Sequence, residues 1–122
     1  GFWDDGDPEV NFLCPSRELL ERNISRFNTK VPIEIVQGSS YPWPLSPYIK
    51  PTTVLIDGDH DYDGCINDWN SVKNITQNYI FIHDFNTVHS GVVKAVKDVI
   101  FKDPNWKLDD LKKTMILMKR VK

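Results

Sequence analysis

Two apolar runs, each followed directly by acidic residues, constrain the fold of this chain more than any other feature of its sequence. Residues 54–56 (Val-Leu-Ile) lead into Asp57, and residues 79–82 (Tyr-Ile-Phe-Ile) lead into His83 and Asp84. Continuous apolar runs rich in β-branched and aromatic residues are typical of strands that are covered on both faces, as in a parallel sheet. Both runs are therefore predicted to be central strands of a sheet.

A helical pattern separates the two predicted strands. Apolar side chains recur at helical spacing over residues 62–76, between a strand over residues 52–57 and a strand over residues 78–83. A helix that joins two parallel strands makes a right-handed crossover, so both carboxyl ends lie at one edge of the sheet, where open α/β sheets bind their ligands. Five polar residues are expected to converge at this edge: Asp57, Asp59, His60, His83 and Asp84.

Helix-capping residues, the spacing of apolar side chains and the prolines predict the other helices, strands and loops. Ser16 is a good N-cap for a helix, and four prolines within residues 41–51 exclude regular structure there. The elements predicted outside the crossover are a helix over residues 16–28, a strand over 33–37, a loop over 41–51, a helix over 90–101 and an antiparallel hairpin over 106–122. The alternation of strands with helices predicts an α/β fold that ends in an antiparallel pair.

Composition narrows the class of protein. With 122 residues, 40% hydrophobic and 26% charged, the chain is predicted to form a single domain over residues 1–122. A net charge of −2 gives no electrostatic attraction to nucleic acid or to an anionic membrane, and no apolar run approaches the roughly 18 residues of a membrane span. Cys14 and Cys65 match no metal-binding spacing and are interpreted as free thiols of a cytoplasmic protein.

The aspartates between residues 57 and 84 allow three interpretations. The first is that turns and helix N-termini favour aspartate, which explains Asp61, Asp63 and Asp68 but not the acids that end buried strands. The second is a calcium loop of the EF-hand type, because Asp59-x-Asp61-x-Asp63-Gly64 matches the first half of that loop. This match fails at the twelfth position, which is asparagine instead of the bidentate glutamate, and a strand precedes it instead of a helix.

The third interpretation is a ligand site at the strand ends. Asp57, His83 and Asp84 offer two carboxylates and an imidazole, which suit a divalent metal such as Mg²⁺ or Mn²⁺. His60 follows Asp57 closely and is placed to abstract a proton as a general base. His60 and His83 are interpreted as functional residues, whereas His89 is interpreted as a structural one.

These strand ends resemble those of class I S-adenosylmethionine-dependent methyltransferases, in particular the branch of small-molecule and sugar O-methyltransferases. That branch often shows an Ile-Asp-Gly-Asp-His-x-Tyr strand end, which is present here at residues 56–62. It also shows a later His-Asp strand end, present here at residues 83–84 and followed by Gly91-Val92 at the start of a helix. The resemblance is best over residues 52–100.

The resemblance implies a Rossmann-like methyltransferase sheet that is mostly parallel and ends in an antiparallel hairpin. Residues 33–37 would be the third strand of that sheet, residues 52–57 the fourth and residues 78–83 the fifth. The carboxyl-terminal hairpin would supply the antiparallel sixth and seventh strands.

The resemblance also implies a cofactor site and a reaction. S-adenosylmethionine would bind with its adenine near Gly38 and Ser39, and its ribose would contact Asp4 or Asp5. Asp57 and Gly58 would also contact the cofactor, while Asp57, His83 and Asp84 match the metal positions of the metal-dependent members. His60 would take the proton of a small-molecule or sugar hydroxyl as the methyl group is transferred, with Asp57 and Asp84 beside it.

The sequence departs from that family at its start. The family carries a glycine-rich cofactor loop after its first strand, whereas the six glycines of this chain form no G-x-G pattern, and the chain begins with Gly1. The chain is therefore interpreted as the carboxyl-terminal two-thirds of a methyltransferase domain, truncated at its N-terminus. The alternative is a non-catalytic α/β remnant that acts as an association module, with homo-oligomers formed through an exposed sheet edge.

Overall fold

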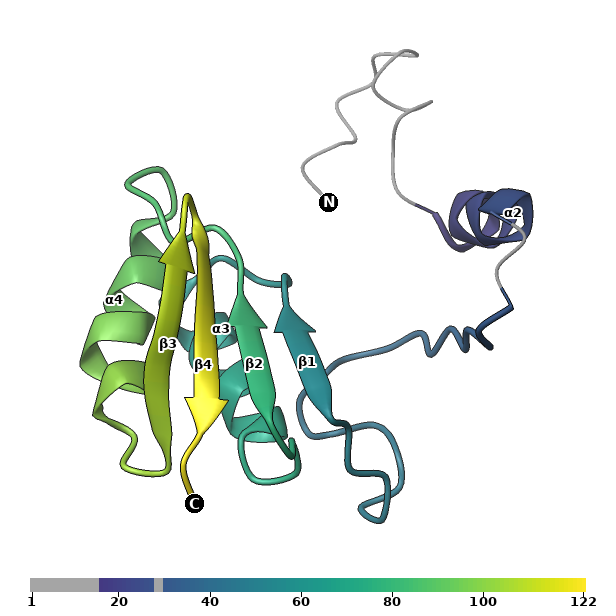
Figure 1. Cartoon of the computed structure of the whole chain (residues 1–122). Coiled ribbons are helices and arrows are strands. Elements are labelled where there is room, and N and C mark those ends of the chain that lie inside the picture. The colour runs from purple at the N-terminus through teal and green to yellow at the C-terminus, as the bar shows by residue number, and fades with distance from the viewer. Residues whose placement is uncertain (1–15, 28–29) are drawn as a thin grey trace. The chain divides into compact units, whose positions relative to one another are not determined.

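The structure is a computed structural model that describes residues 16–27 and 30–122. The chain forms two compact units, one that ends at Gln37 and one that runs from Gly38 to Lys122. Helix α2 (Arg17–Phe27) belongs to the first unit, and the sheet with the remaining helices belongs to the second (Figure 1). Among the described residues, no helix reaches the length and apolarity that a membrane crossing requires.

The first unit confirms one predicted element and corrects another. Helix α2 begins as predicted, because the Leu19 amide donates a hydrogen bond to Ser16 Oγ at 3.1 Å. The predicted strand over residues 33–37 is wrong, since this segment has no regular structure. A strand needs a neighbour to satisfy its backbone groups, and no described residue of the first unit lies in a strand.

The second unit is a small α/β domain with a four-stranded mixed sheet. Its strands are β1 (Thr53–Ile56), β2 (Tyr79–Ile82), β3 (Trp106–Lys112) and β4 (Met115–Arg120), in the order β1-β2-β4-β3. Strands β1 and β2 are parallel, as the crossover predicted, and β3 with β4 forms the predicted antiparallel hairpin.

The prediction of a mostly parallel sheet is wrong, because most neighbouring strands of the described sheet are antiparallel. Strand β4 inserts between β2 and β3 and is antiparallel to both, so two of the three neighbouring pairs are antiparallel. Strands β1, β2 and β3 nevertheless run in the same direction. The carboxyl ends of β1 and β2 and the turn of the β3–β4 hairpin therefore lie at one edge of the sheet (Figure 1).

Helices α3 (Tyr62–Val72) and α4 (Ser90–Asp98) cover one face of the sheet, and the short 3-10 helix η1 (Ile100–Lys102) follows α4 (Figure 1). The core lies between these helices and that face. Its most completely buried side chains include Trp69, Ile80, Ile82, Val96, Ile100, Ile116 and Met118. Helix α3 is shorter than predicted, because the chain turns after Val72, where the buried hydroxyl of Thr76 donates to the Val72 carbonyl at 2.8 Å.

The opposite face of the sheet is only partly covered by the described residues. Ile56 is 7% exposed, whereas its neighbour Leu55 is 56% exposed. Leu55 pairs in register with Phe81, which pairs with Leu117, and both of these side chains are half-buried. The expectation that both faces would be covered is therefore wrong for the second unit, because both of its α-helices lie on the same face.

Candidate functional site

The ends of β1 and β2 bring the predicted polar residues together. The His83 amide donates to the Ile56 carbonyl at 3.1 Å, which continues the parallel pairing to the last residue of each strand. Just beyond it, His83 Nδ1 lies 3.0 Å from Asp57 Oδ1. The predicted convergence of Asp57, His83 and Asp84 is confirmed, and the parallel register brings Asp57 beside His83.

Asp84 is the central residue of this edge. Its backbone has a φ of 62°, a left-handed conformation in which aspartate is one of the few tolerated residues. Its side chain is 19% exposed, with Oδ1 3.3 Å from His83 Nδ1 and Oδ2 2.7 Å from His60 Nε2. One carboxylate thus contacts two imidazoles that come from different segments of the chain.

Three side chains could hold a metal at the strand ends. Asp57, His83 and Asp84 each place one ligand atom within 4.8 Å of the others, and Asp57 is exposed while the other two are half-buried. Two carboxylate oxygens and one imidazole nitrogen form a donor set that Mn²⁺ accepts readily, whereas Mg²⁺ prefers oxygen alone. The residues therefore fit a divalent metal of that kind.

A second group of possible ligands was missed by sequence reasoning. His60, Asp84 and His89 also place their ligand atoms within 4.8 Å of one another. His89, interpreted above as structural, occupies the N-cap position of α4, and its ring stacks on that of His60 with centroids 4.0 Å apart. The available signal was the position of His89, seven residues after the end of β2 and directly before a helix.

Asp59 does not belong to either group, which corrects the expectation that it would converge with the strand-end residues. Its Oδ1 accepts a hydrogen bond from the Asp61 amide at 2.9 Å, and its carboxylate lies against Gly64, where an added Cβ would stand 2.5 Å away. Asp59 therefore shapes the turn into α3. The calcium-loop interpretation fails as well, because Asp63 already lies within that helix.

Two adjacent cavities lie beside the end of β1. One of about 310 Å³ is lined by Gly38, Ser39, Gly58 and Asp59 among others, and one of about 330 Å³ is lined by Trp43, Ile56 and Asp57 among others. Ser40, Gly58 and Asp68 line both cavities, and Ser40 Oγ hydrogen-bonds to Asp68 Oδ1. Gly38 and Ser39 thus line the same cavity as Gly58, which follows the end of β1.

Cys65 has no part in this site. Cys65 is a free thiol, as predicted, and burial raises its pKa to about 11, with further contributions from the nearby carboxylates of Asp68 and Asp59. A protonated, buried thiol is not a nucleophile at neutral pH. The predicted ribose ligands Asp4 and Asp5, together with Cys14, lie outside the described residues.

A separate cavity lies in the first unit. It has a volume of about 510 Å³ and is lined by α2 and the segment before Gly38, with Leu19, Leu20 and Ile35 as its apolar wall. None of its lining residues belongs to the two histidine and aspartate groups.

Comparison with protein-family models finds no match for this chain, and comparison with curated proteins finds none either. The likeness to class I methyltransferases therefore rests on the residues at the strand ends.

Proposed function

We propose that this chain is part of a class I methyltransferase domain that transfers a methyl group from S-adenosylmethionine to a hydroxyl of a small molecule or sugar, with the help of a divalent metal. The observation that carries the proposal is the cluster of Asp57, His60, His83 and Asp84 at the carboxyl ends of two parallel strands. Such strand ends are where open α/β sheets bind ligands.

The sheet supports the same proposal at a coarser level. A parallel pair of strands joined by a helix, followed by an antiparallel hairpin, agrees with what the resemblance implied for the fourth to seventh strands. The finer assignment, to the methyltransferase sheet itself, is part of the proposal. It would also explain why β1, a central strand in that family, has no partner along its outer edge among the described residues.

The cavities beside β1 fit a nucleoside-sized cofactor. Their volumes of about 330 and 310 Å³ each reach the lower end of the range for small-molecule pockets, and Ser40, Gly58 and Asp68 line both of them. Glycine at position 58 lets Asp68 approach the strand end closely, since an added Cβ would stand 2.9 Å from Asp68 Oδ2. S-adenosylmethionine bound here would supply an electrophilic methyl group.

The side chains at the edge fit the proton transfer that O-methylation requires. The hydrogen bond between His60 Nε2 and Asp84 Oδ2 fixes the ring and places the Nε2 proton toward the carboxylate, which leaves Nδ1 as the basic nitrogen. His60 takes the proton of the acceptor hydroxyl at Nδ1, and Asp84 stabilises the imidazolium that results. Asp57 and His83 would hold a metal that orients the acceptor oxygen.

One observation favours the alternative of a non-catalytic association module. Strand β1 forms an edge of the described sheet, and Leu55 on that strand is 56% exposed. An edge strand with an exposed apolar side chain is a template for pairing with another chain. This module would keep the fold without binding a metal or a cofactor at the strand ends.

The metal part of the proposal is tested by calorimetric titration with Mn²⁺. The parent chain is expected to bind one Mn²⁺, and Asp57→Asn is expected to weaken that binding by at least about tenfold. Asp57 is exposed and its carboxylate has no role in the core, so the variant should keep the parent's circular dichroism spectrum.

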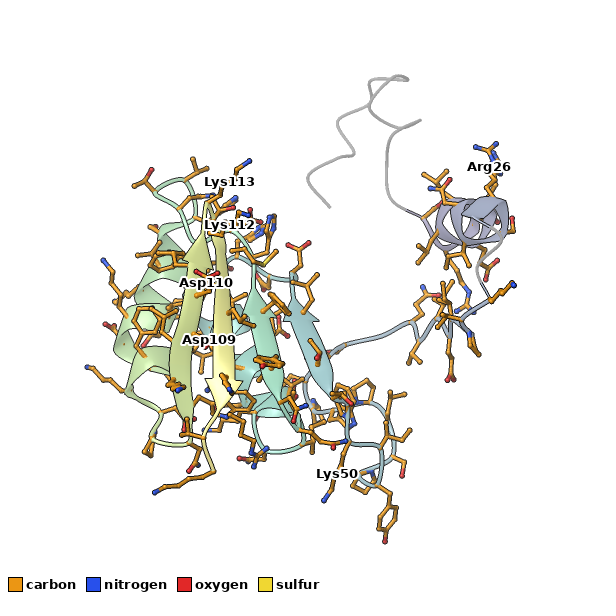
Figure 2. The ribbon with its side chains drawn as sticks, viewed as in Figure 1. Arg26, Lys50, Asp109, Asp110, Lys112 and Lys113 are labelled. Atoms are coloured by element: carbon orange, nitrogen blue, oxygen red, sulfur yellow. The ribbon has the colours of Figure 1, made fainter. Side chains whose placement is uncertain are left out.

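The matched control is Asp109→Asn, which removes the same charge from an exposed position on β3, outside both ligand groups (Figure 2). This control should bind Mn²⁺ within about twofold of the parent. Equal binding by the parent and by Asp57→Asn would show that the strand ends do not form the metal site.

A further inference from the structure

We propose a second metal site, formed by His60, His89 and Asp84, that selects a zinc-like transition metal. The three residues come from the β1–α3 loop, the N-cap of α4 and the end of β2, and their ligand atoms lie within 4.8 Å of one another. His89 has no place in the proposed methyl transfer. The inference does not rest on that transfer, because it concerns binding of the metal alone, and a metal held by His60 and Asp84 would replace the proton that His60 Nε2 shares with Asp84 in the proposed transfer.

The donor set distinguishes this site from the first one. Two imidazole nitrogens and one carboxylate oxygen are the ligands of many catalytic zinc sites, which keep a fourth position open. Imidazole suits Zn²⁺, Co²⁺ and Fe²⁺, whereas a site with two carboxylates favours Mn²⁺ and Mg²⁺. The two sites should therefore differ in metal preference although they lie at the same edge.

The backbone holds the two histidines together over a long sequence separation. The start of α4 packs against the loop that carries His60 so closely that a Cβ on Gly91 would stand 2.5 Å from the His60 carbonyl oxygen. On the His89 side, the His89 amide donates to Asn86 Oδ1 at 3.1 Å, which fixes the start of the helix. The packing of α4 against the His60 loop and the hydrogen bond at Asn86 thus position both histidines, as a built site requires.

The arrangement of the rings also favours a shared cation. The rings of His60 and His89 are stacked, with centroids 4.0 Å apart and an interplanar angle of 24°. Each ring offers a nitrogen that can bind a metal, and these nitrogens lie within 4.8 Å of each other and of an Asp84 oxygen. Asp84 Oδ2, 2.7 Å from His60 Nε2, supplies the negative charge.

Asp84 joins the two sites. Its Oδ1 faces His83 and its Oδ2 faces His60, so one carboxylate can contribute an oxygen to each metal. Carboxylates that bridge two metal positions are a feature of two-metal sites. The backbone of Asp84 is left-handed, with a φ of 62°, and its carboxylate lies between the rings of His60 and His83.

The test uses three variants of the untagged chain, titrated by calorimetry with Zn²⁺ and separately with Mn²⁺. His89→Gln is expected to weaken Zn²⁺ binding by at least about tenfold and to leave Mn²⁺ binding within about threefold of the parent. Asp57→Asn is expected to give the reverse pattern. Asp84→Asn, which removes the shared ligand, is expected to weaken both.

The ligands themselves are checked by Co²⁺ substitution. The parent with one Co²⁺ should show the intense visible absorption of a four-coordinate ion, and His89→Gln should lose most of it. If His89→Gln is found by circular dichroism to be unfolded, His60→Gln replaces it, because that residue is half-exposed in a loop. Zn²⁺ binding that is unchanged in the folded histidine variant, or that is lost equally in Asp57→Asn, would overturn the proposal.

Discussion

The helix-covered face of the sheet and its carboxyl edge are built from neighbouring residues of the same strands, yet they differ in almost every physical respect. Ile80 and Ile82 of β2 are fully buried against α3 and α4, while His83 and Asp84, the next two residues, are polar and half-exposed. The face stabilises the fold through apolar burial, and the edge gathers groups that can bind and react. This separation means that residues at the edge can change without loss of the fold.

The largest effect is expected for a core substitution on the covered face. Ile80→Ala should lower the free energy of unfolding by about 2–5 kcal/mol, because it removes a fully buried side chain from a close-packed core. Urea denaturation followed by circular dichroism measures this change. Leu55→Ala on the neighbouring strand is the matched control, and its loss should stay below about 1 kcal/mol because Leu55 is mostly exposed.

Similar losses of unfolding free energy in Ile80→Ala and Leu55→Ala would contradict the distinction between a covered and an open face of the sheet. A large effect of Leu55→Ala would mean that the second face of the sheet is covered as well, by a part of the chain outside the described residues or by another copy. Sedimentation of the parent chain would separate those two cases, since only the second depends on protein concentration.

A smaller effect is expected where the core and the edge meet, at Gly91. A Cβ there would stand 2.5 Å from the His60 carbonyl oxygen and 2.8 Å from the Tyr62 amide nitrogen, so the loop or the helix must shift. Gly91→Ala should lower the free energy of unfolding by about 1–3 kcal/mol, in spite of the higher helix propensity of alanine. Ser90→Ala, at the adjacent exposed position, is the control.

The same variant sharpens the comparison by a second readout. Movement of α4 away from the His60 loop should separate His60 from His89 and weaken Zn²⁺ binding while Mn²⁺ binding is kept. If Gly91→Ala kept the stability and the Zn²⁺ affinity of the parent, the contact between Gly91 and the His60 loop would position neither α4 nor His60.

The parts of the fold that depend on local pattern could be predicted from the sequence. Apolar runs located β1 and β2, helical spacing located α3 and α4, and the crossover placed Asp57 beside His83. The expected strand over residues 33–37 failed because a strand depends on a neighbour that a local pattern does not specify. Likewise, the exposure of Leu55 depends on which face the helices cover, and an apolar run does not carry that information.

The candidate site was predictable only where it follows from strand register. His89 was missed because its contact with His60, 29 residues earlier, depends on how α4 packs against the His60 loop. That packing requires glycine at position 91, where a Cβ would meet the His60 carbonyl. Asp59 was wrongly placed at the edge, since its carboxylate is taken up by the Asp61 amide in a local turn. A strand-end position therefore predicts a site residue only when no nearby backbone group captures its side chain.

The measurement that tests the central claim most directly is calorimetric titration of the chain with S-adenosylhomocysteine, with and without Mn²⁺. The account predicts saturable binding of one ligand with a Kd below about 1 mM, which should be weakened in Gly58→Ala because a Cβ there meets Asp68 beside both cavities. A folded parent chain that shows no saturable binding under either condition would contradict a methyltransferase site at these strand ends.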